Sequence, residues 1–512
     1  MRLRVSLPMM GLCAWLLAGG GGLAAQPAAE DALEPATASA IYLMQRSVQV
    51  RRDGLHNRLL GSLRHLRDPL LEPLFAELAR ASHPALQIHG NLALAELSPA
   101  RELDLRRLAE IDDPAVQAEL VTAAMDADLL SHVEAAKLLA WPGLDMGVRL
   151  LAAARLMEAG ELADEHHASL RKGLDAGRLA RRGLAALLLH QLGDATGTAG
   201  LQAINDWQGD DRDAVRAMLL NTAMRHKFER SGDWAYAVAS EPGVERRLGL
   251  LALQTAMRFG HPRAATHWQT QFQSTRDTAQ RTRLALVALQ MAPWLEAGVF
   301  ETLREAEDEL IQQMGDTGLA IAEGRPTVAD AVLALIGRQH AVANGWALHY
   351  AATDARPADA RRILLGLIDA YEDAPDEHRI RRLDEAVQAT QTLYEQDPAA
   401  AAELLRPRLT DADRDALLVR GILLGLVRTQ QGEPWRVIDP ITDWPDADAD
   451  RLALLLRARH DQPLTDRQMR ELGVMVQGGG GLQDSLRIQA AWAWLKRKQQ
   501  THLALAAVLG DR

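Results

Sequence analysis

Cysteine is almost absent from this sequence. The only one among 512 residues is Cys13, and it lies in an apolar stretch close to the N-terminus. A chain with a single cysteine forms no internal disulfide, and removal of the segment around Cys13 would end thiol chemistry as well. We therefore expect packing alone to stabilise the folded part of the protein.

Aromatic residues are also scarce. They make up 4% of the chain, whereas apolar residues make up 48% and are mostly Ala and Leu. Ala and Leu favour helices, and sheets are richer in aromatic and β-branched residues. The composition predicts an all-α fold with ample material for a core. The one short strand candidate surrounds Trp435–Ile438, where we expect a loop instead.

Excess positive charge and long apolar runs are missing too. The net charge is −11, which on average repels nucleic acid and anionic lipid. No segment beyond the N-terminal one is long and apolar enough to read as a membrane span. We expect no nucleic-acid partner and no membrane span in the mature chain.

The N-terminus carries the most specific signal in the sequence. Arg2 and Arg4 precede an apolar run over 5–18, which is followed by glycines at 19–22 and by a small-residue segment ending at Ala25. A short positive segment, a short apolar run and small residues are typical of a secretory signal peptide. We expect a signal peptide over 1–25, cleavage after Ala25 and a periplasmic location.

Two further features adjoin the predicted signal peptide. Cys13 is a candidate lipidation site, but Leu12 stands where a lipoprotein signal has a small residue, so a lipoprotein is not expected. Residues 26–37 are rich in Ala, Pro and acidic residues and are predicted to form a flexible leader.

From about residue 38 the pattern is helical, with a break every 12 to 18 residues or so. The breaks carry proline or glycine at positions suited to helix starts, as at Asp68-Pro69, His83-Pro84, Ser98-Pro99, Asp113-Pro114 and Trp141-Pro142-Gly143. The segment from His83 to Gln87 recurs from Asp113 to Gln117, an interval of about 30 residues that fits two helices and two turns.

Later helices repeat one arrangement more loosely. A branched apolar residue is followed by a polar one and then by a small one, which gives a buried stripe that a neighbouring helix can approach closely. Examples are Val148-Arg149 with Ala152 and Leu156, Val215-Arg216 with Leu219 and Ala223, and Leu486-Arg487 with Ala490 and Leu495.

This arrangement resembles the short bacterial form of the HEAT-like repeat, most clearly over residues 69–160, weakly to about 260 and again near 484–496. Residues 248–270, with Ala256, Gly260, Ala264 and Ala265, resemble a tetratricopeptide-type hairpin instead. Either resemblance implies antiparallel helical hairpins stacked into an α-solenoid with a concave surface.

The chain is expected to divide into a HEAT-like region over 38–325, a second helical block over 326–477, and a glycine-rich hinge with a C-terminal helix over 478–512. The break at Gly324-Arg325-Pro326 separates the first two. Thr327, Thr410 and Thr465 are predicted to cap helices, Thr465 within a capping box.

Four glycines at 478–481 precede the last predicted helix pattern. They are expected to form a hinge or exposed loop, and no Lys-Ser/Thr follows that would suit a phosphate loop. Trp492 and Trp494 project about 200° apart on a helix, so one interface is not expected to bury both. We expect this helix to be a terminal cap, with partner contact as the alternative.

Residues 169–172, Ser169-Leu170-Arg171-Lys172, contain a candidate catalytic motif. It matches the Ser-x-x-Lys of penicillin-binding enzymes, in which the lysine activates the serine. No Lys-Thr-Gly follows, and the mixed α/β fold of those enzymes is not predicted. An exposed helix face is the expected role.

Three acidic segments have metal-ligand residue types. Adjacent histidines in Asp164-Glu165-His166-His167 point about 100° apart on a helix and suit no single ion. Asp446, Asp448 and Asp450 alternate as in a calcium loop, but Arg451 and Arg457 replace the required Gly and Glu. Acidic residues at helix starts explain this run, and likewise 210–213.

The remaining histidines are scattered, and four of them lie in or beside apolar runs, where a structural role is usual: His65, His190, His226 and His349. We therefore predict no catalytic, cofactor-binding or metal-binding residues. With five Tyr and five Phe, the aromatic lining of a polysaccharide lyase or hydrolase would be thin. The chain also lacks the Glu-Ser step of soluble lytic transglycosylases, whose helical superhelix this architecture resembles.

The expectation from the sequence is a non-catalytic, exported helical-repeat scaffold. It would bind a protein or peptide partner on its concave face in the bacterial cell envelope. The alternative is an all-α lyase or hydrolase acting on cell-wall or extracellular polysaccharide.

Overall fold

The computed structural model describes residues 33–510, apart from 142, 163–165, 412–414, 431 and 479–481. The predicted signal peptide, Cys13 and most of the predicted leader lie outside the described residues, and so does most of the four-glycine run. The fold is all-α: the described residues form helices and no strand. In the part of the chain that is described, no helix is both long and apolar enough to cross a membrane.

The chain packs into two compact units. The first combines the residues up to Asp104 with those from Ala347 onward, and the second runs from Leu105 to Trp346. The border thus falls inside helix α20 (Ala341–Thr353). The predicted divisions at residues 326 and 478 stay predictions.

The second unit contains the helices that follow. They are α5 (Leu105–Ala109), α6 (Pro114–Asp126), α7 (His132–Ala140), α8 (Met146–Ala159), α9 (His167–Gly173), α10 (Leu179–Gln191), α11 (Ala195–Asn205), α12 (Arg212–His226), α13 (Gly232–Ala239), α14 (Arg246–Arg258), α15 (Ala264–Ser274), α16 (Thr278–Gln290), α17 (Ala297–Arg304), α18 (Glu309–Ala322) and α19 (Val328–Gly337).

The even-numbered helices of this unit form a series in which each helix packs against the next one. The series runs α6, α8, α10, α12, α14, α16 and α18, and each intervening helix pairs with a member of it, as α7 does with α8, α11 with α10 and α17 with α18. Each hairpin therefore buries its apolar face against its neighbours rather than alone.

The helices of this series begin at regular intervals. Their N-cap positions recur after about 31 to 34 residues, at Asp113, Asp145, Arg178, Asp211, Glu245, Asp277 and Asp308. Five of these seven side chains accept a hydrogen bond from the backbone of the first turn. A carboxylate there satisfies free N–H groups and suits the positive end of the helix dipole. The predicted interval between His83 and Asp113 separates the N-cap positions of α4, in the first unit, and α6, although the side chain of His83 makes no capping hydrogen bond.

The first unit contains helices from both ends of the chain. They are α1 (Pro35–Val48), α2 (Leu55–Leu66), α3 (Glu72–Leu78), α4 (Pro84–Leu97), α21 (Pro357–Asp369), α22 (Asp376–Gln396), α23 (Pro398–Thr410), α24 (Ala416–Arg428), α25 (Trp435–Ile438), α26 (Ala447–Arg459), α27 (Asp466–Gln477), α28 (Asp484–Arg497) and α29 (Thr501–Gly510).

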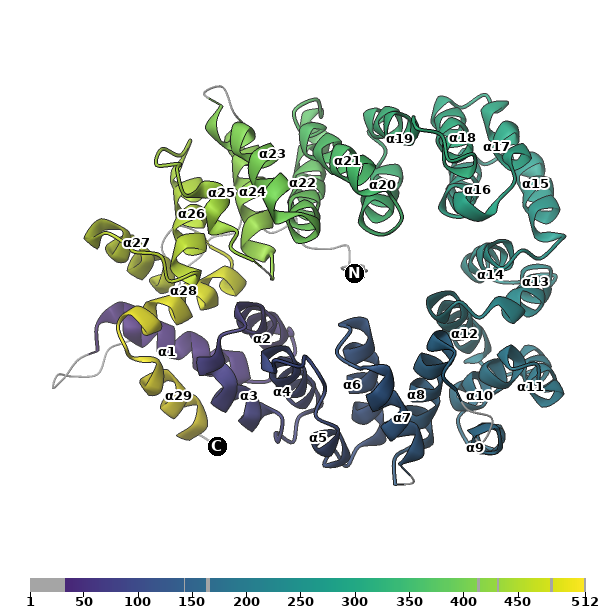
Figure 1. Cartoon of the computed structure of the whole chain (residues 1–512), viewed down its shortest axis with the longest axis horizontal. Coiled ribbons are helices and arrows are strands. Elements are labelled where there is room, and N and C mark those ends of the chain that lie inside the picture. The colour runs from purple at the N-terminus through teal and green to yellow at the C-terminus, as the bar shows by residue number, and fades with distance from the viewer. Residues whose placement is uncertain are drawn as a thin grey trace. The chain divides into compact units, whose positions relative to one another are not determined.

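A second packed series joins the two chain segments of this unit. It runs α4, α2, α28, α26, α24 and α22, each helix contacting the next, and α1 packs against α27, α28 and α29 (Figure 1). The first described helix of the chain thus lies beside the last ones. Helix α28 sits inside the series, so the prediction that it is a terminal cap is wrong.

Both tryptophans of α28 are buried, each against a different part of the first unit, in agreement with the expectation that one interface would not bury both. The indole N–H of Trp492 donates to Asp68 (3.0 Å), and that of Trp494 donates to Thr37 (3.1 Å). The two rings do point to different sides of the helix, as their spacing indicates. Both are buried because α28 has neighbours on both sides, which a terminal helix lacks.

The predicted caps have mixed outcomes. Thr465 forms the predicted capping box with Gln468. Thr327 occupies the N-cap position of α19, but its side chain makes no capping hydrogen bond. The prediction for Thr410 is wrong, because this residue ends α23 and the carboxylate of Asp415 caps α24 instead. Residues 435–438 form a short helix, neither the strand candidate nor the expected loop.

Glycine marks the closest helix contacts. A Cβ atom at Gly90 of α4 would lie 2.7 Å from the carbonyl oxygen of Phe75 in α3, and one at Gly197 of α11 would lie 2.7 Å from that of Ala186 in α10. Real Cβ atoms do not approach so closely, so only glycine lets these hairpins close.

Candidate functional site

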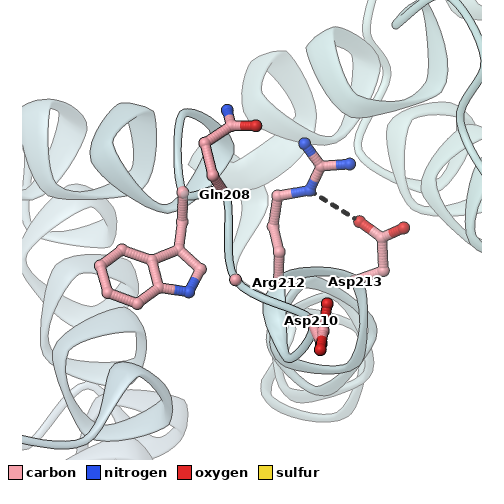
Figure 2. Close-up of a pocket in the computed structure, with 6 residues that line it drawn as sticks. Gln208, Asp210, Arg212 and Asp213 are labelled. Carbon is pink, nitrogen blue, oxygen red and sulfur yellow. Dashed lines mark hydrogen bonds and ion pairs between the residues drawn. The ribbon is translucent and has the colours of Figure 1, made fainter.

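Two open depressions lie on the second unit. One follows α15 and faces α13, and the other lies at the start of α12. The first is lined by Tyr236, Arg263, Thr266, His267, Thr270, Gln271 and Ser274. The second is lined by Trp207, Gln208, Gly209, Asp210, Arg212 and Asp213, of which Figure 2 labels four.

Helix α15 presents a continuous polar stripe to the first depression. From Arg263 onward, the lining residues of this helix follow at three- and four-residue steps, so they share one face. The opposite face carries Ala264, Trp268 and Phe272, which are buried. The apolar face fixes the helix in the core and leaves the polar stripe to solvent. We call the residues 263, 266, 267, 270, 271 and 274 the α15 stripe.

His267 sits at the centre of a hydrogen-bonded chain. The amide nitrogen of Gln271 lies 2.7 Å from its Nε2, and the hydroxyl of Ser240 lies 3.4 Å from its Nδ1. Since the amide nitrogen can only donate, Nε2 accepts and Nδ1 carries the proton toward Ser240. Burial lowers the pKa of His267 below its usual value, which favours the same neutral imidazole.

Tyr236 is held between an imidazole and a guanidinium. The ring of His261 stacks on it with centroids 4.0 Å apart and planes inclined by 13°, and the guanidinium of Arg263 lies 5.0 Å from the ring centroid. Burial lowers the pKa of His261 despite the opposing charge of Asp233, 3.6 Å away. The phenol is therefore fixed at the edge of the depression beside a neutral imidazole.

The hydroxyl oxygens of Thr270 and Ser274 in the α15 stripe can accept further hydrogen bonds. Thr270 donates to the carbonyl of Thr266 (2.9 Å), and Ser274 donates to that of Gln271 (3.1 Å). Their protons are thus used within the helix, while the oxygen lone pairs face the depression. Together with Arg263, the stripe can accept hydrogen bonds from a ligand and also donate to it.

The second depression is built around Trp207. Its indole N–H donates to Asp211 (2.9 Å), and Arg182 lies 5.2 Å from the ring. Arg212 pairs with Asp213 at 3.0 Å, as Figure 2 shows. The acidic run at 210–213 does stand at a helix start, as predicted, but the side chain of Asp211 binds the indole and does not cap α12.

The Ser-x-x-Lys pair lies on α9. The hydroxyl of Ser169 accepts a hydrogen bond from Arg149 at 2.7 Å, and Lys172 is exposed. Ser169 is thus engaged by a guanidinium from another helix.

The metal-type segments are tied into helix ends. Asp446 caps α26 and accepts hydrogen bonds from Arg420 (2.9 Å), while Asp448 pairs with Arg420 (3.0 Å) and Arg451 (3.2 Å). Burial acts to raise the pKa of Asp446, but the bonds from Arg420 and the backbone outweigh it and lower the pKa. Asp164 and Glu165 lie outside the described residues. Among the residues that are described, no group of three or more His, Cys, Asp or Glu could hold a metal ion.

The four singled-out histidines have different surroundings. His226 contacts Glu158 (3.1 Å), His190 contacts Thr198 and the carbonyl of Arg230 (both 2.9 Å), and His65 contacts Gln430 (3.4 Å). His349 is exposed on α20. None of the four lines either depression.

Sequence reasoning did not single out the residues of the first depression, and of the second it considered only the acidic run at 210–213, as a helix start and not as part of a site. The α15 stripe has a signal that could have been found, namely hydroxyl, amide and imidazole residues at helical spacing through 263–274. The contact of Tyr236 with His261 has no such signal, because it depends on how α13 meets the loop before α15. No protein-family model matches the chain, and no curated protein or solved structure shows significant similarity to it.

Proposed function

We propose that this protein is a non-catalytic helical-repeat scaffold that binds an extended segment of a partner protein along the α15 stripe. The α15 stripe is the observation that carries the proposal. It is a solvent-facing row of hydrogen-bonding side chains on a helix anchored by Trp268 and Phe272. An extended peptide offers backbone N–H and C=O groups at short, regular spacing, which such a row can satisfy.

The repeat supports a scaffold role. We infer that the hairpins of each unit stack as an α-solenoid, whose surface would present such rows to a partner. The interval of about 31 to 34 residues between N-caps is closer to the 34 residues of a tetratricopeptide hairpin than to the 40 to 47 of HEAT repeats. Of the two resemblances, the tetratricopeptide type therefore fits the second unit better.

Export to the periplasm is part of the proposal and rests on the sequence of residues 1–25. N-terminal sequencing of protein recovered from an envelope fraction tests it, with a new N-terminus close to Gln26 expected. An intact Met1 on that protein would contradict it.

Peptide binding is tested by selecting ligands from a displayed library of random peptides with the purified chain. Selected peptides are then measured by calorimetry against the wild type and two arginine variants. Thr270→Arg fills the α15 stripe, and Val133→Arg changes a residue of α7 that is 66% exposed. We expect Thr270→Arg to weaken binding at least about tenfold and Val133→Arg to leave it unchanged. Equal binding by both variants would overturn the proposal.

The alternative is an all-α enzyme acting on polysaccharide. It is favoured by one observation, the presence of the Tyr236 phenol and the His267 imidazole at one depression, since such groups serve proton transfer. Incubation with cell-wall and extracellular polysaccharides, followed by analysis of chain length, tests it. Cleavage by the wild type that is lost in Tyr236→Phe would favour the enzyme over the scaffold.

A further inference from the structure

The indole of Trp207 is exposed and yet fixed in place. The residue is 39% exposed, so part of a large aromatic ring is open to solvent. Its N–H is bonded to Asp211 at 2.9 Å, and Arg182 lies 5.2 Å from its ring. The ring thus loses little conformational freedom if something binds against it.

The loop after Trp207 is shaped around the indole. A Cβ atom at Gly209 would overlap Nε1 of Trp207 and would lie 3.0 Å from the carboxylate of Asp211. Only glycine allows the backbone to pass so close to the ring edge. The indole, the glycine and the carboxylate therefore form one preorganised structure.

Polar groups with unused capacity surround this ring. Within the described part of the chain, the carboxylate of Asp210 has no hydrogen-bond or ion-pair partner. Gln208 uses its amide nitrogen on the carbonyl of Asp206 (3.0 Å), which leaves its amide oxygen available. The Nε of Arg212 donates a hydrogen bond to Asp213. Among the described residues, the other guanidinium nitrogens of Arg212 have one acidic neighbour, Glu241, at 3.7 Å.

A buried arginine fixes the far side of the depression. Arg216 is 1% exposed and pairs with Glu241 at 2.7 Å and with Asp213 at 3.4 Å. Both carboxylates are thereby held in place, and Asp213 in turn orients Arg212. Donors and acceptors beside Trp207 are therefore positioned before any ligand arrives.

We propose that this depression binds a neutral sugar unit of an oligosaccharide. A hexopyranose has an apolar C–H face that suits an aromatic ring, and hydroxyls that both donate and accept. The hydroxyls would donate to Asp210 and Gln208 and accept from Arg212. Four carboxylates (Asp210, Asp211, Asp213 and Glu241) stand beside three guanidiniums (Arg182, Arg212 and Arg216), so the net charge of the surroundings disfavours a uronate or phosphate. This inference is independent of the α15 stripe and of any peptide ligand.

Trp294 provides the matched control. It is 42% exposed, and Arg258 lies 2.9 Å from the centre of its ring. Trp294 thus shares exposure and a stacked arginine with Trp207. It does not line either depression described above.

The test is saturation-transfer NMR and calorimetry of the full mature chain with chitotetraose, cellotetraose and maltotetraose, and with tetragalacturonate as the charged comparison. We expect at least one neutral tetrasaccharide to bind. Trp207→Ala should weaken that binding at least about tenfold, while Trp207→Phe keeps most of it and Trp294→Ala all of it. Helix content measured by circular dichroism should be the same in all variants.

Three outcomes would overturn the inference. One is the absence of binding by any neutral tetrasaccharide at about 10 mM, which exceeds the Kd of weak single-site ligands. Another is binding to tetragalacturonate alone. The third is equal affinity of Trp207→Ala and the wild type.

Discussion

The indole N–H of Trp494 donates a hydrogen bond to the hydroxyl of Thr37 at 3.1 Å, across 457 residues of sequence. Thr37 in turn donates to Gln500 at 2.8 Å, and the ammonium of Lys498 lies 2.9 Å from the carboxylate of Glu34. These contacts attach α1 to the C-terminal helices. The first unit is therefore held together by side chains from the two ends of the chain.

Replacement of Trp494 should loosen α1 in particular. Trp494→Phe removes the N–H donor and should cost about 1 to 2 kcal/mol, whereas Trp494→Ala also leaves a cavity and should cost about 3 to 5 kcal/mol. Hydrogen exchange of the amides over residues 35–48 measures the effect. Trp294→Phe, in the second unit, is the control and should leave this protection unchanged. Unaltered exchange of α1 in Trp494→Ala would refute the attachment.

Two glycine-to-alanine changes should act in opposite directions. At Gly90 the new Cβ would lie 2.7 Å from backbone atoms of α3, so we expect a loss of at least about 2 kcal/mol. At Gly61, inside α2, nothing lies within 4 Å, and alanine should stabilise the helix by about 0.5 to 1 kcal/mol. Urea denaturation of both variants tests the pair. A stable Gly90→Ala variant would mean that α3 and α4 do not pack so closely.

The first unit should lose stability in weak acid. Burial, assisted by the nearby arginines 459, 64, 67 and 428, lowers the pKa of His65 from 6.5 to about 4. Burial likewise lowers the pKa of His89 and His460 to about 4. The unfolded chain binds protons first, so these neutral imidazoles contribute stability above about pH 6.5 that is lost as the pH falls toward 4.

The measurement is the urea midpoint of unfolding at several pH values between 7.5 and 4. The midpoint should fall across this window in the wild type and fall less in His65→Gln. His349→Gln, which changes an exposed histidine, serves as the comparison. A midpoint independent of pH between 6.5 and 4.5 would disprove the prediction.

Asp446 should stabilise α26 in two ways, as an N-cap hydrogen-bond acceptor and as the partner of Arg420 in an ion pair. Its side chain accepts hydrogen bonds from the backbone N–H groups of Asp448 and Ala449 and pairs with Arg420. Asp446→Ala should cost about 1 to 2 kcal/mol. Asp446→Asn keeps a good N-cap and should cost about half as much, since only the partly buried ion pair with Arg420 is weakened. Thermal unfolding compares the two, and equal losses would show that the cap is unimportant.

The sequence was informative about helices and their starts. An Ala- and Leu-rich composition led to an all-α fold, and the His83 to Asp113 interval identified the N-cap positions of two helices, α4 and α6. These features are local, because a cap and its helix lie within one turn. The same local reasoning placed the capping box at Thr465.

Contacts between distant segments could not be predicted in this way. The polar contacts of the buried Trp492 and Trp494 are with Asp68, which follows α2, and with Thr37 of α1, both more than 400 residues away. The cap of α24 was missed because α23 continues through Thr410, so that Asp415, five residues later, is the residue whose carboxylate caps α24. The first and second depressions were not predicted for the same reason, since each is lined by side chains from separate helices and loops.

Because α1 packs against α28, α1 cannot complete its native contacts until α28 has been synthesised. Helix α1 leaves the ribosome about 450 residues before α28, an interval of about 20 to 90 s at common elongation rates. Throughout that time the apolar side of α1, with Leu43 and Met44 that are buried in the finished fold, lacks its final neighbours. Helix α1 therefore cannot reach its native packing until the last helices of the chain have been made.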